Sequence, residues 1–498
     1  MKRKQFYVTV VLAALFLLQS RVYSDPAHHY LTATPIKHVV ILFQENVSFD
    51  HYFGTYPYAL NPPGEPPFYA KPNTPAINGY TYYLLHHNPN LVNPFRLDRK
   101  KVLTCDQNHE YGAEIKAYNG GLMNRFVQET GSRYDHCSPD TVMGYFDGNT
   151  VTALWNYAQK FAMDDNAFGT NFGPSTMGAL NLIAGTSAGV HPRNYLDKVV
   201  NGVDIADLNP TYDDCSPHHK QTIKVIGENI GNLLNQKKIT WGWFQGGFTP
   251  TKWVHGIAVC GSYSYNIGGR KVRNYMPHHE PFQYFKQTAN PHHLPPSSPY
   301  KIGYPDQANH QYGLRDFWLS LKYHTMPAVC FIKAPAVGDG HAGMGYSDPL
   351  DEQKYLVNFL NRLQKTKEWK STLVILTYDD SDGWYDHVFP PILRHSNDLK
   401  NDSGLCGKGI PATQDRCGPG PRLPFLVISP YSRENYVSHH FVEQASILKF
   451  IENNWKLGRL NNPADADRES GSILDMLNFK KPNFNPFILN PKTGEQTY

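Results

Sequence analysis

The feature that most constrains the fold is a short apolar run that ends in a group of carboxylates. Residues 372–377 read TLVILT, without the polar alternation of a half-exposed strand. This pattern is typical of a strand buried on both faces, as in a parallel sheet covered by helices. Asp379, Asp380 and the Asp382-Gly383 turn follow directly. Ligands collect beyond the carboxyl ends of such strands, so the carboxylates predict a cation site, with a merely polar turn as the alternative.

The rest of the chain predicts an α/β fold. Apolar runs predict further strands and amphipathic segments predict helices between them, including one capped by Asp351. The expected strands are 36–43, 240–244, 328–333 and 423–429, and the expected helices are 150–162, 226–236, 314–323, 351–363 and 441–457. Alternation of this kind indicates a doubly wound, largely parallel central sheet with helices on both faces and long loop-rich insertions. We expect one catalytic domain over residues 30–460, with 461–498 as a C-terminal tail packed on it.

The first residues predict export. Three basic residues, an apolar stretch of about 13 residues and a Val-Tyr-Ser site are typical of a signal peptide over residues 1–24. An uncleaved anchor is the alternative, but the stretch is short for a membrane span. We therefore expect a secreted or periplasmic protein with no transmembrane anchor after cleavage. Cleavage would lower the count of Lys and Arg from 47 to 43, equal to the 43 Asp and Glu, which provides no electrostatic case for nucleic acid.

The seven cysteines predict disulfides. Cys330 lies inside an apolar run and is expected to be a buried free thiol. Sequence order favours Cys105–Cys137, Cys215–Cys260 and Cys406–Cys417, although six cysteines allow about 15 pairings. A zinc cluster is not expected, because the sequence has no C-x2-C pair.

Two further segments carry the same kind of chemistry as the carboxylates. Glu45 and Asn46 end the first predicted strand, and Ser175 follows Pro174 at a predicted helix start. Oxygen ligands favour a hard or borderline divalent cation. A serine at a helix start would face free backbone N–H groups, which suit phosphate, although a simple helix cap is the alternative. Gly178 lies one residue too late for G-x-S-x-G, so metal-assisted attack on phosphorus remains. Among the histidines of the irregular segments we favour His109, His279 and His341.

Four motifs extend over most of the chain and resemble a known family. They are residues 36–54 (IKHVVILFQENVSFDHYFG), 172–176 (FGPST), 277–281 (PHHEP) and 378–387 (YDDSDGWYDH). Together they resemble the bacterial phospholipase C/acid phosphatase phosphoesterase family of the alkaline-phosphatase-like superfamily, and most of all the branch of respiratory-burst-inhibiting acid phosphatases. The segment 403–418, with Cys406 and Cys417, is an extra insertion relative to that branch.

The resemblance implies a site and an activity. It implies that Ser175 forms a phosphoseryl intermediate and that one divalent metal ion, of unknown identity, is held by Glu45, Asn46, Asp379 and Asp380. Around the phosphoryl group it places His109, His278 or His279, and His341. The expected function is an exported phosphomonoesterase of the acid phosphatase type. The alternatives are a phospholipase C that cleaves phosphodiester headgroups and a non-catalytic secreted binding module with a structural cation. The expected partner is a phosphomonoester or phospholipid substrate, and a homodimer is left open.

Overall fold

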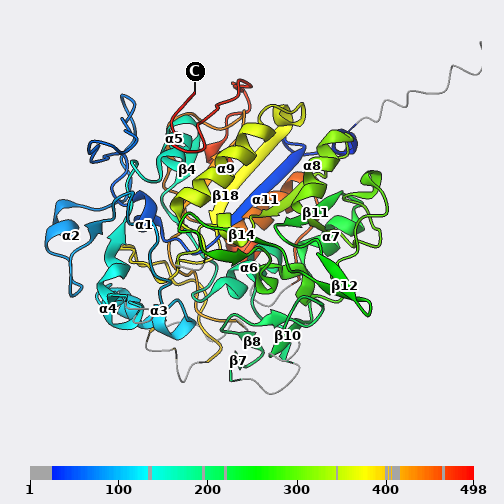
Figure 1. The fold of residues 1–498 in the computed structure, drawn as a ribbon, viewed down its shortest axis with the longest axis horizontal. Helices are drawn as coiled ribbons and strands as arrows, with labels where there is room; N and C mark the ends of the chain where they lie inside the picture. The colour runs from blue at the N-terminus through cyan, green and yellow to red at the C-terminus, as the bar shows by residue number, and fades with distance from the viewer. Residues whose placement is uncertain are drawn as a thin grey trace, which may run out of the picture.

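The computed structural model describes residues 25–132, 137–192, 197–217, 221–343, 346–398, 402, 405–406, 415–461 and 466–497. Its centre is an eight-stranded sheet, and Figure 1 shows how the other elements are arranged around it. In spatial order the strands are β16 (Gln311–Gly313), β11 (Trp241–Gln245), β17 (Val329–Lys333), β1 (His38–Gln44), β18 (Thr372–Tyr378), β19 (Phe425–Ile428), β4 (Ala162–Asp164) and β20 (Tyr436–Ser438). β19 pairs antiparallel with both neighbours, and the other pairings are parallel.

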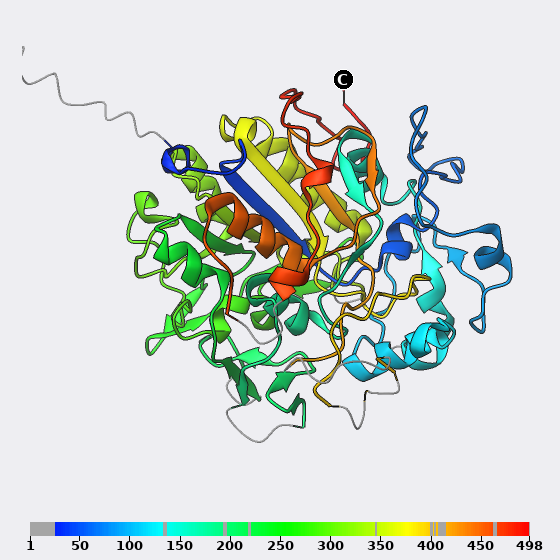
Figure 2. The same ribbon diagram turned by 180° about the vertical axis from the view of Figure 1, so that it is seen from behind.

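Helices cover both faces of this sheet. Because successive side chains of a strand point to opposite faces, Val39, Ile41 and Phe43 of β1 pack in one apolar cluster, and Val40 and Leu42 pack in another. The first cluster includes α6 (Ser175–Ala184), α7 (Ile230–Gln236) and α11 (Gln444–Trp455), and the second includes α5 (Thr152–Lys160), α8 (Leu314–Lys322) and α9 (Pro349–Leu363). Figure 1 shows α8 and α9 in front of the sheet, and Figure 2 shows the orange α11 covering its other face. The predicted doubly wound α/β fold is confirmed.

Long insertions interrupt this core, as predicted. Five short helices, two β-hairpins, a three-stranded sheet and several two-residue strands of the described residues lie in them or beside them. These elements are α1 (Phe49–Phe53), α2 (Tyr82–His86), α3 (Tyr111–Tyr118), α4 (Phe126–Glu129), β12 (Lys252–Val254), β13 (Ile257–Val259), β14 (Tyr263–Tyr265), β15 (Lys271–Arg273), β6 (Val190–Pro192), β9 (Asn209–Pro210), β10 (Thr222–Val225), β2 (Phe95–Arg96), β3 (Gly144–Tyr145), β5 (Ala167–Phe168), β7 (Val199–Val200), β8 (Val203–Asp204), β21 (Val442–Glu443) and α12 (Ala466–Glu469).

Several helix starts differ from the sequence prediction, and in two of them the capping residue explains the difference. Helix α9 begins at Pro349, and its cap is Asp348, whose side chain accepts hydrogen bonds from the backbone of Leu350 and Asp351. Proline fits the first turn of a helix because it has no N–H to satisfy there, so the helix starts earlier than Asp351. Helix α7 begins at Ile230, four residues later than expected, because Asn229 caps it.

The remaining structural predictions concern the cysteines and the ends of the chain. All three predicted disulfides form, and Cys330 is a buried free thiol. The predicted signal peptide, 1–24, lies outside the described residues. Phe487 and Leu489 donate backbone hydrogen bonds to Gln364 and Asn361 at 2.8 and 3.1 Å, so part of the C-terminal segment lies against α9 and the loop after it. The domain boundary at residue 460 stays a prediction. Within the described ranges, no helix has both the length and the apolar character to cross a bilayer.

Candidate active site

The register between β1 and β18 brings two carboxylate segments together. Gln44 is paired with Tyr378 at the carboxyl ends of these parallel strands, so Glu45 and Asp379 emerge side by side. Asn46 then turns through the left-handed region, with φ of 63°. Its backbone N–H donates to Asp379 Oδ1 at 3.0 Å, and the N–H of Asp380 donates to the same oxygen at 2.7 Å. These hydrogen bonds make the two strand ends one rigid unit.

Ser175 faces this unit from the first residue of α6. Its hydroxyl oxygen lies 3.0 Å from Glu45 Oε2 and 3.0 Å from Asp380 Oδ2, and 3.5 Å from Asn46 Oδ1. Ser175 is 1% exposed, and the N-cap position of α6 is occupied by Pro174 rather than by Ser175. The structure therefore brings the predicted nucleophile and the predicted ligands into one place.

Gly178 permits this approach of α6. A Cβ atom at Gly178 would lie 2.2 Å from the carbonyl oxygen of Asp379, a distance that atoms do not tolerate. Ser175 lies one helical turn earlier on the same helix, so the contact at Gly178 sets the distance between the Ser175 hydroxyl and the end of β18. The glycine that excluded a nucleophile elbow thus has a packing role of its own.

All four predicted histidines lie around Ser175. The short turn Pro277–His279 places His279 Nδ1 3.2 Å from Glu45 Oε1, and the His278 ring lies 4.3 Å from the His279 ring. His109 Nδ1 lies 3.1 Å from Asp382 Oδ1, and its ring centroid lies 6.4 Å from that of His341.

Their surroundings separate these histidines electrostatically. Burial lowers the pKa of His279 well below its usual value. Burial also lowers the pKa of His109, but the nearby carboxylates, with Asp380 as the largest contribution, outweigh burial and raise this pKa well above its usual value. The site thus contains one imidazole that readily holds a proton and one that does not.

The residues present fit a divalent cation. A hydroxyl has a single proton, yet three acceptor oxygens surround that of Ser175. Asp379 Oδ2 is buried and accepts no hydrogen bond from the residues that the structure describes. Burial, and then the neighbouring charge of Asp379, raises the pKa of Glu45 and of Asp380 well above the usual range. A cation held by Glu45, Asn46, Asp379 and Asp380 would compensate the charge that makes this arrangement costly.

Several polar residues of the site were not singled out in the sequence. Lys333 ends β17 and forms an ion pair with Glu45, and Glu45 N–H donates to the Asp339 carbonyl at 2.8 Å. Glu114 Oε2 accepts from Gly173 N–H at 2.8 Å and its Oε1 accepts from Ser381 Oγ at 2.5 Å. Lys333 could have been predicted from the sequence, because it lies at the end of an expected strand as Glu45 does. Glu114 lies at no such position, so the sequence does not indicate its role.

Asp207 corrects one expectation about the start of α6. The sequence suggested free backbone N–H groups there, but the Thr176 N–H donates to Asp207 Oδ1 at 3.0 Å. Burial raises the pKa of Asp207, but His278 and then His109 outweigh burial and lower it below the usual range. Asp207 is exposed and His109 and His278 are half-buried, whereas Ser175 is buried. These three residues therefore lie nearer to solvent than Ser175, on the side from which a substrate would approach.

Comparisons with known proteins show which families and proteins this chain resembles. The model of the family described as the Phosphoesterase family matches residues 36–458. The non-hemolytic phospholipase C of Pseudomonas aeruginosa is 24% identical over 94% of this chain, which spans 61% of its length. Phospholipase C A of Mycobacterium tuberculosis is 23% identical over 93% of this chain and 81% of its own length. A solved structure, a protein in the alkaline phosphatase superfamily from Vibrio parahaemolyticus, is 9% identical, covers 72% of this chain and 77% of its own, and has a TM-score of 0.33.

Proposed function

Because the chain belongs to the Phosphoesterase family, we propose that it is a phosphoester hydrolase of the phospholipase C type with Ser175 as its nucleophile. The observation that carries this proposal is the Ser175 hydroxyl, 3.0 Å from one carboxylate of each of two strand ends. The named phospholipases among its relatives favour the phospholipase C alternative over the acid phosphatase interpretation. Export through residues 1–24 is part of the proposal.

The proposed hydrolase uses one divalent cation. Glu45, Asn46, Asp379 and Asp380 would hold it. When bound, the cation lowers the pKa of a neighbouring hydroxyl and offsets negative charge on phosphoryl oxygens. The Lys333 ammonium group lies in the same cluster and is held by Glu45, so it contributes further positive charge behind the ligands.

The proposed reaction has two displacement steps at phosphorus. The Ser175 hydroxyl passes its proton to solvent by way of the carboxylates 3.0 Å away, and Ser175 Oγ forms a bond to phosphorus while the bond from phosphorus to the glycerol oxygen of the lipid breaks. A histidine donates a proton to that oxygen, and His109 is suited to do so because three carboxylates lie around its ring, those of Asp382, Asp207 and Asp106. Water then attacks the phosphoseryl intermediate, which releases the phosphorylated headgroup and restores the Ser175 hydroxyl. His278, His279 and His341 would hydrogen-bond the phosphoryl oxygens.

The test compares Ser175→Ala with the wild type on phosphatidylcholine and on p-nitrophenyl phosphate. We expect the wild type to turn over phosphatidylcholine faster than the phosphomonoester. We expect Ser175→Ala to lower the turnover of phosphatidylcholine by at least about a thousandfold. Ser320→Ala is a matched control, because Ser320 is also buried and helical but donates only to Phe317. An active, folded Ser175→Ala protein would overturn the mechanism, and preference for the phosphomonoester would restore the acid phosphatase interpretation.

A further inference from the structure

Two consecutive β-hairpins project from the insertion between β11 and β16. The first consists of β12 and β13, and the second consists of β14 and β15. Residues 260–262 join them, a disulfide ties this junction to an earlier segment, and a hydrogen bond closes the base of the second hairpin. Cys260 is bonded to Cys215, and Asn274 N–H donates to the Ser262 carbonyl at 3.1 Å. The hairpins therefore share one base that is tied to the body of the protein.

Large apolar side chains of both hairpins face solvent. Trp253 is 47% exposed, Tyr265 is 62% exposed and Ile267 is 53% exposed. Single exposed apolar residues are common on soluble proteins, but a concentration of them within one short segment marks an interaction surface. The exposed large apolar residues of this segment are Trp253, Val254, Ile257, Tyr263, Tyr265 and Ile267. We call this surface, with its basic residues, the hairpin surface.

The hairpin surface is basic, although the mature chain is expected to be close to neutral. Residues 246–279 contain no Asp or Glu, and they contain Lys252, Arg270, Lys271 and Arg273, all of which are exposed. Lys271 Nζ lies 3.6 Å from the centre of the Tyr263 ring, so charge and aromatic surface are interleaved. This combination complements an anionic lipid surface, where aromatic rings lie at headgroup level and basic groups meet phosphates.

The hairpin surface lies next to the mouth of the active site. β15 leads through residues 274–276 directly into the turn with His278 and His279. At the tip of the second hairpin, Asn266 Nδ2 donates to the Tyr346 carbonyl at 3.1 Å, and the Tyr346 ring lies 4.3 Å from the His341 ring. Figure 1 accordingly shows β14 near the carboxyl end of β18. A membrane bound here would therefore lie close to the histidines of the site.

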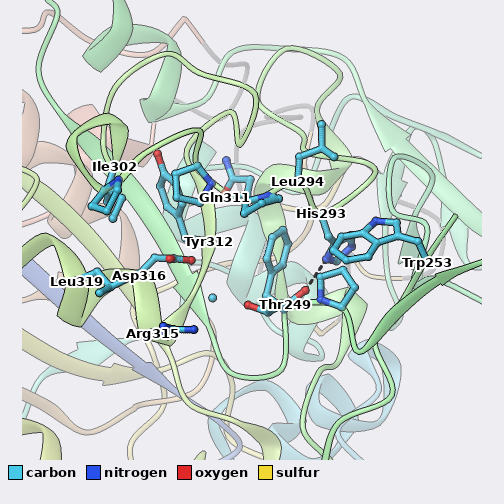
Figure 3. A pocket seen from close by; sticks show the side chains of 16 residues that line it. Thr249, Trp253, His293, Leu294, Ile302, Gln311, Tyr312, Arg315, Asp316 and Leu319 are labelled. Atoms are coloured by element: carbon cyan, nitrogen blue, oxygen red, sulfur yellow. Dashed lines mark hydrogen bonds between the residues drawn. The ribbon is translucent and has the colours of Figure 1, made fainter. Parts of the chain in front are cut away.

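The apolar surface continues inward behind the first hairpin. Trp253 and Leu294 line a cavity of about 340 Å³ together with Pro250, Pro295 and Tyr312. Figure 3 shows Trp253 and Leu294 on one side of this cavity and Tyr312 and Asp316 on the other. Trp253 Nε1 donates to the His292 carbonyl at 3.2 Å, which holds the indole at the cavity edge. The exposed face of Trp253 thus belongs to an apolar surface deeper than the hairpin alone.

We propose that the hairpin surface docks on an anionic phospholipid bilayer and presents the mouth of the active site to the headgroups. This inference rests on the proposed phospholipase C activity for its purpose, but the docking itself is a binding event that requires no catalysis. Its physical basis is twofold. Aromatic and aliphatic side chains gain free energy on leaving water at the interface, and the basic side chains are attracted to anionic headgroups.

Docking is tested with the Ser175→Ala protein and sedimented vesicles of phosphatidylcholine, with and without phosphatidylglycerol. We expect binding to the mixed vesicles that weakens as salt rises. Lys252→Gln with Lys271→Gln should weaken binding about fivefold for each charge removed, and Tyr265→Ser with Ile267→Ser should weaken it at every salt concentration. Tyr58→Ser and Lys480→Gln are matched controls, because both positions are exposed and lie outside the hairpins.

The outcomes separate this proposal from the proposed function. Vesicle binding that is insensitive to salt, or equal in hairpin and control variants, overturns docking whatever the enzyme hydrolyses. Hairpin-dependent binding without lipid turnover by the wild type supports docking and contradicts the phospholipase C activity. If both hold, the ratio of vesicle turnover to p-nitrophenylphosphorylcholine turnover should fall in the hairpin variants and stay at the wild-type value in the controls.

Discussion

Gly178 is the residue at which α6 touches the end of β18, so Gly178→Ala perturbs the position of Ser175 directly. The added Cβ would lie 2.2 Å from the Asp379 carbonyl oxygen, and ordinary contact begins at 3.4 Å, so the two must separate by about 1.2 Å. This carbonyl accepts a hydrogen bond from Gln444 Nε2 at 2.6 Å, and the Asp379 N–H donates to the Gln44 carbonyl at 3.1 Å, so the backbone is fixed and α6 has to move. Displacement of a reacting group by about 1 Å costs roughly a hundredfold in rate.

The assay is kcat/KM together with thermal unfolding. We expect a loss of about a hundredfold in kcat/KM and a fall of about 1–3 kcal/mol in the free energy of unfolding, the usual cost of overpacking. Gly112→Ala is the control, because Gly112 is also helical, in α3, but has nothing within 4 Å of the added Cβ. A Gly178→Ala protein with wild-type activity and stability would refute the argument that this contact positions Ser175.

Two further predictions concern the metal and pH. Removing the metal with a chelator should abolish turnover, and adding Zn²⁺ or another divalent ion should restore it. The backbone hydrogen bonds around Asp379 should keep the metal-free protein folded. Cooperative melting on chelation would instead favour the non-catalytic module with a structural cation. Burial lowers the pKa of His310 from 6.5 to about 4 and that of His51 to about 3. The unfolded chain binds these protons near pH 6.5 and the folded protein does not, so stability is lost as pH falls below 6.5, by about 2 kcal/mol at pH 5 for His310. His310→Asn should make the fall in melting temperature between pH 6.5 and 5 less steep, because only the contribution of His51 remains of the two, and an unchanged slope would contradict this assignment.

The pattern of apolar residues within each segment predicted the strands that position the site. The segments that became β1 and β18 each contain an unbroken apolar run, residues 39–43 and 373–376, a signal that needs no knowledge of neighbours. The three-residue strands β4, β16 and β20 were not predicted, because so short a segment has no periodicity and is held only by pairing with the adjacent strand. For the same reason the antiparallel direction of β19 could not be read from its residues.

Some residues of the candidate site could likewise be predicted from the sequence, and others could not. Glu45, Asn46, Asp379 and Asp380 could be proposed because each follows a recognisable strand, and Ser175 because a proline precedes it. Asp207 and Glu114 reach the site from insertions, through contacts with Thr176 and with Gly173 and Ser381. Sequence carries no period or motif that announces such contacts.

The amino-acid sequence alone determined which segments are buried and where polar oxygen atoms follow them, and it favoured one of many possible cysteine pairings. The tertiary structure decided the register of β1 against β18 and the approach of α6 at Gly178. The physical reason is the separation along the chain over which each kind of interaction acts. Burial and turn chemistry act between neighbours in the chain, whereas the 3.0 Å distances at Ser175 result from packing a helix onto strands more than a hundred residues away.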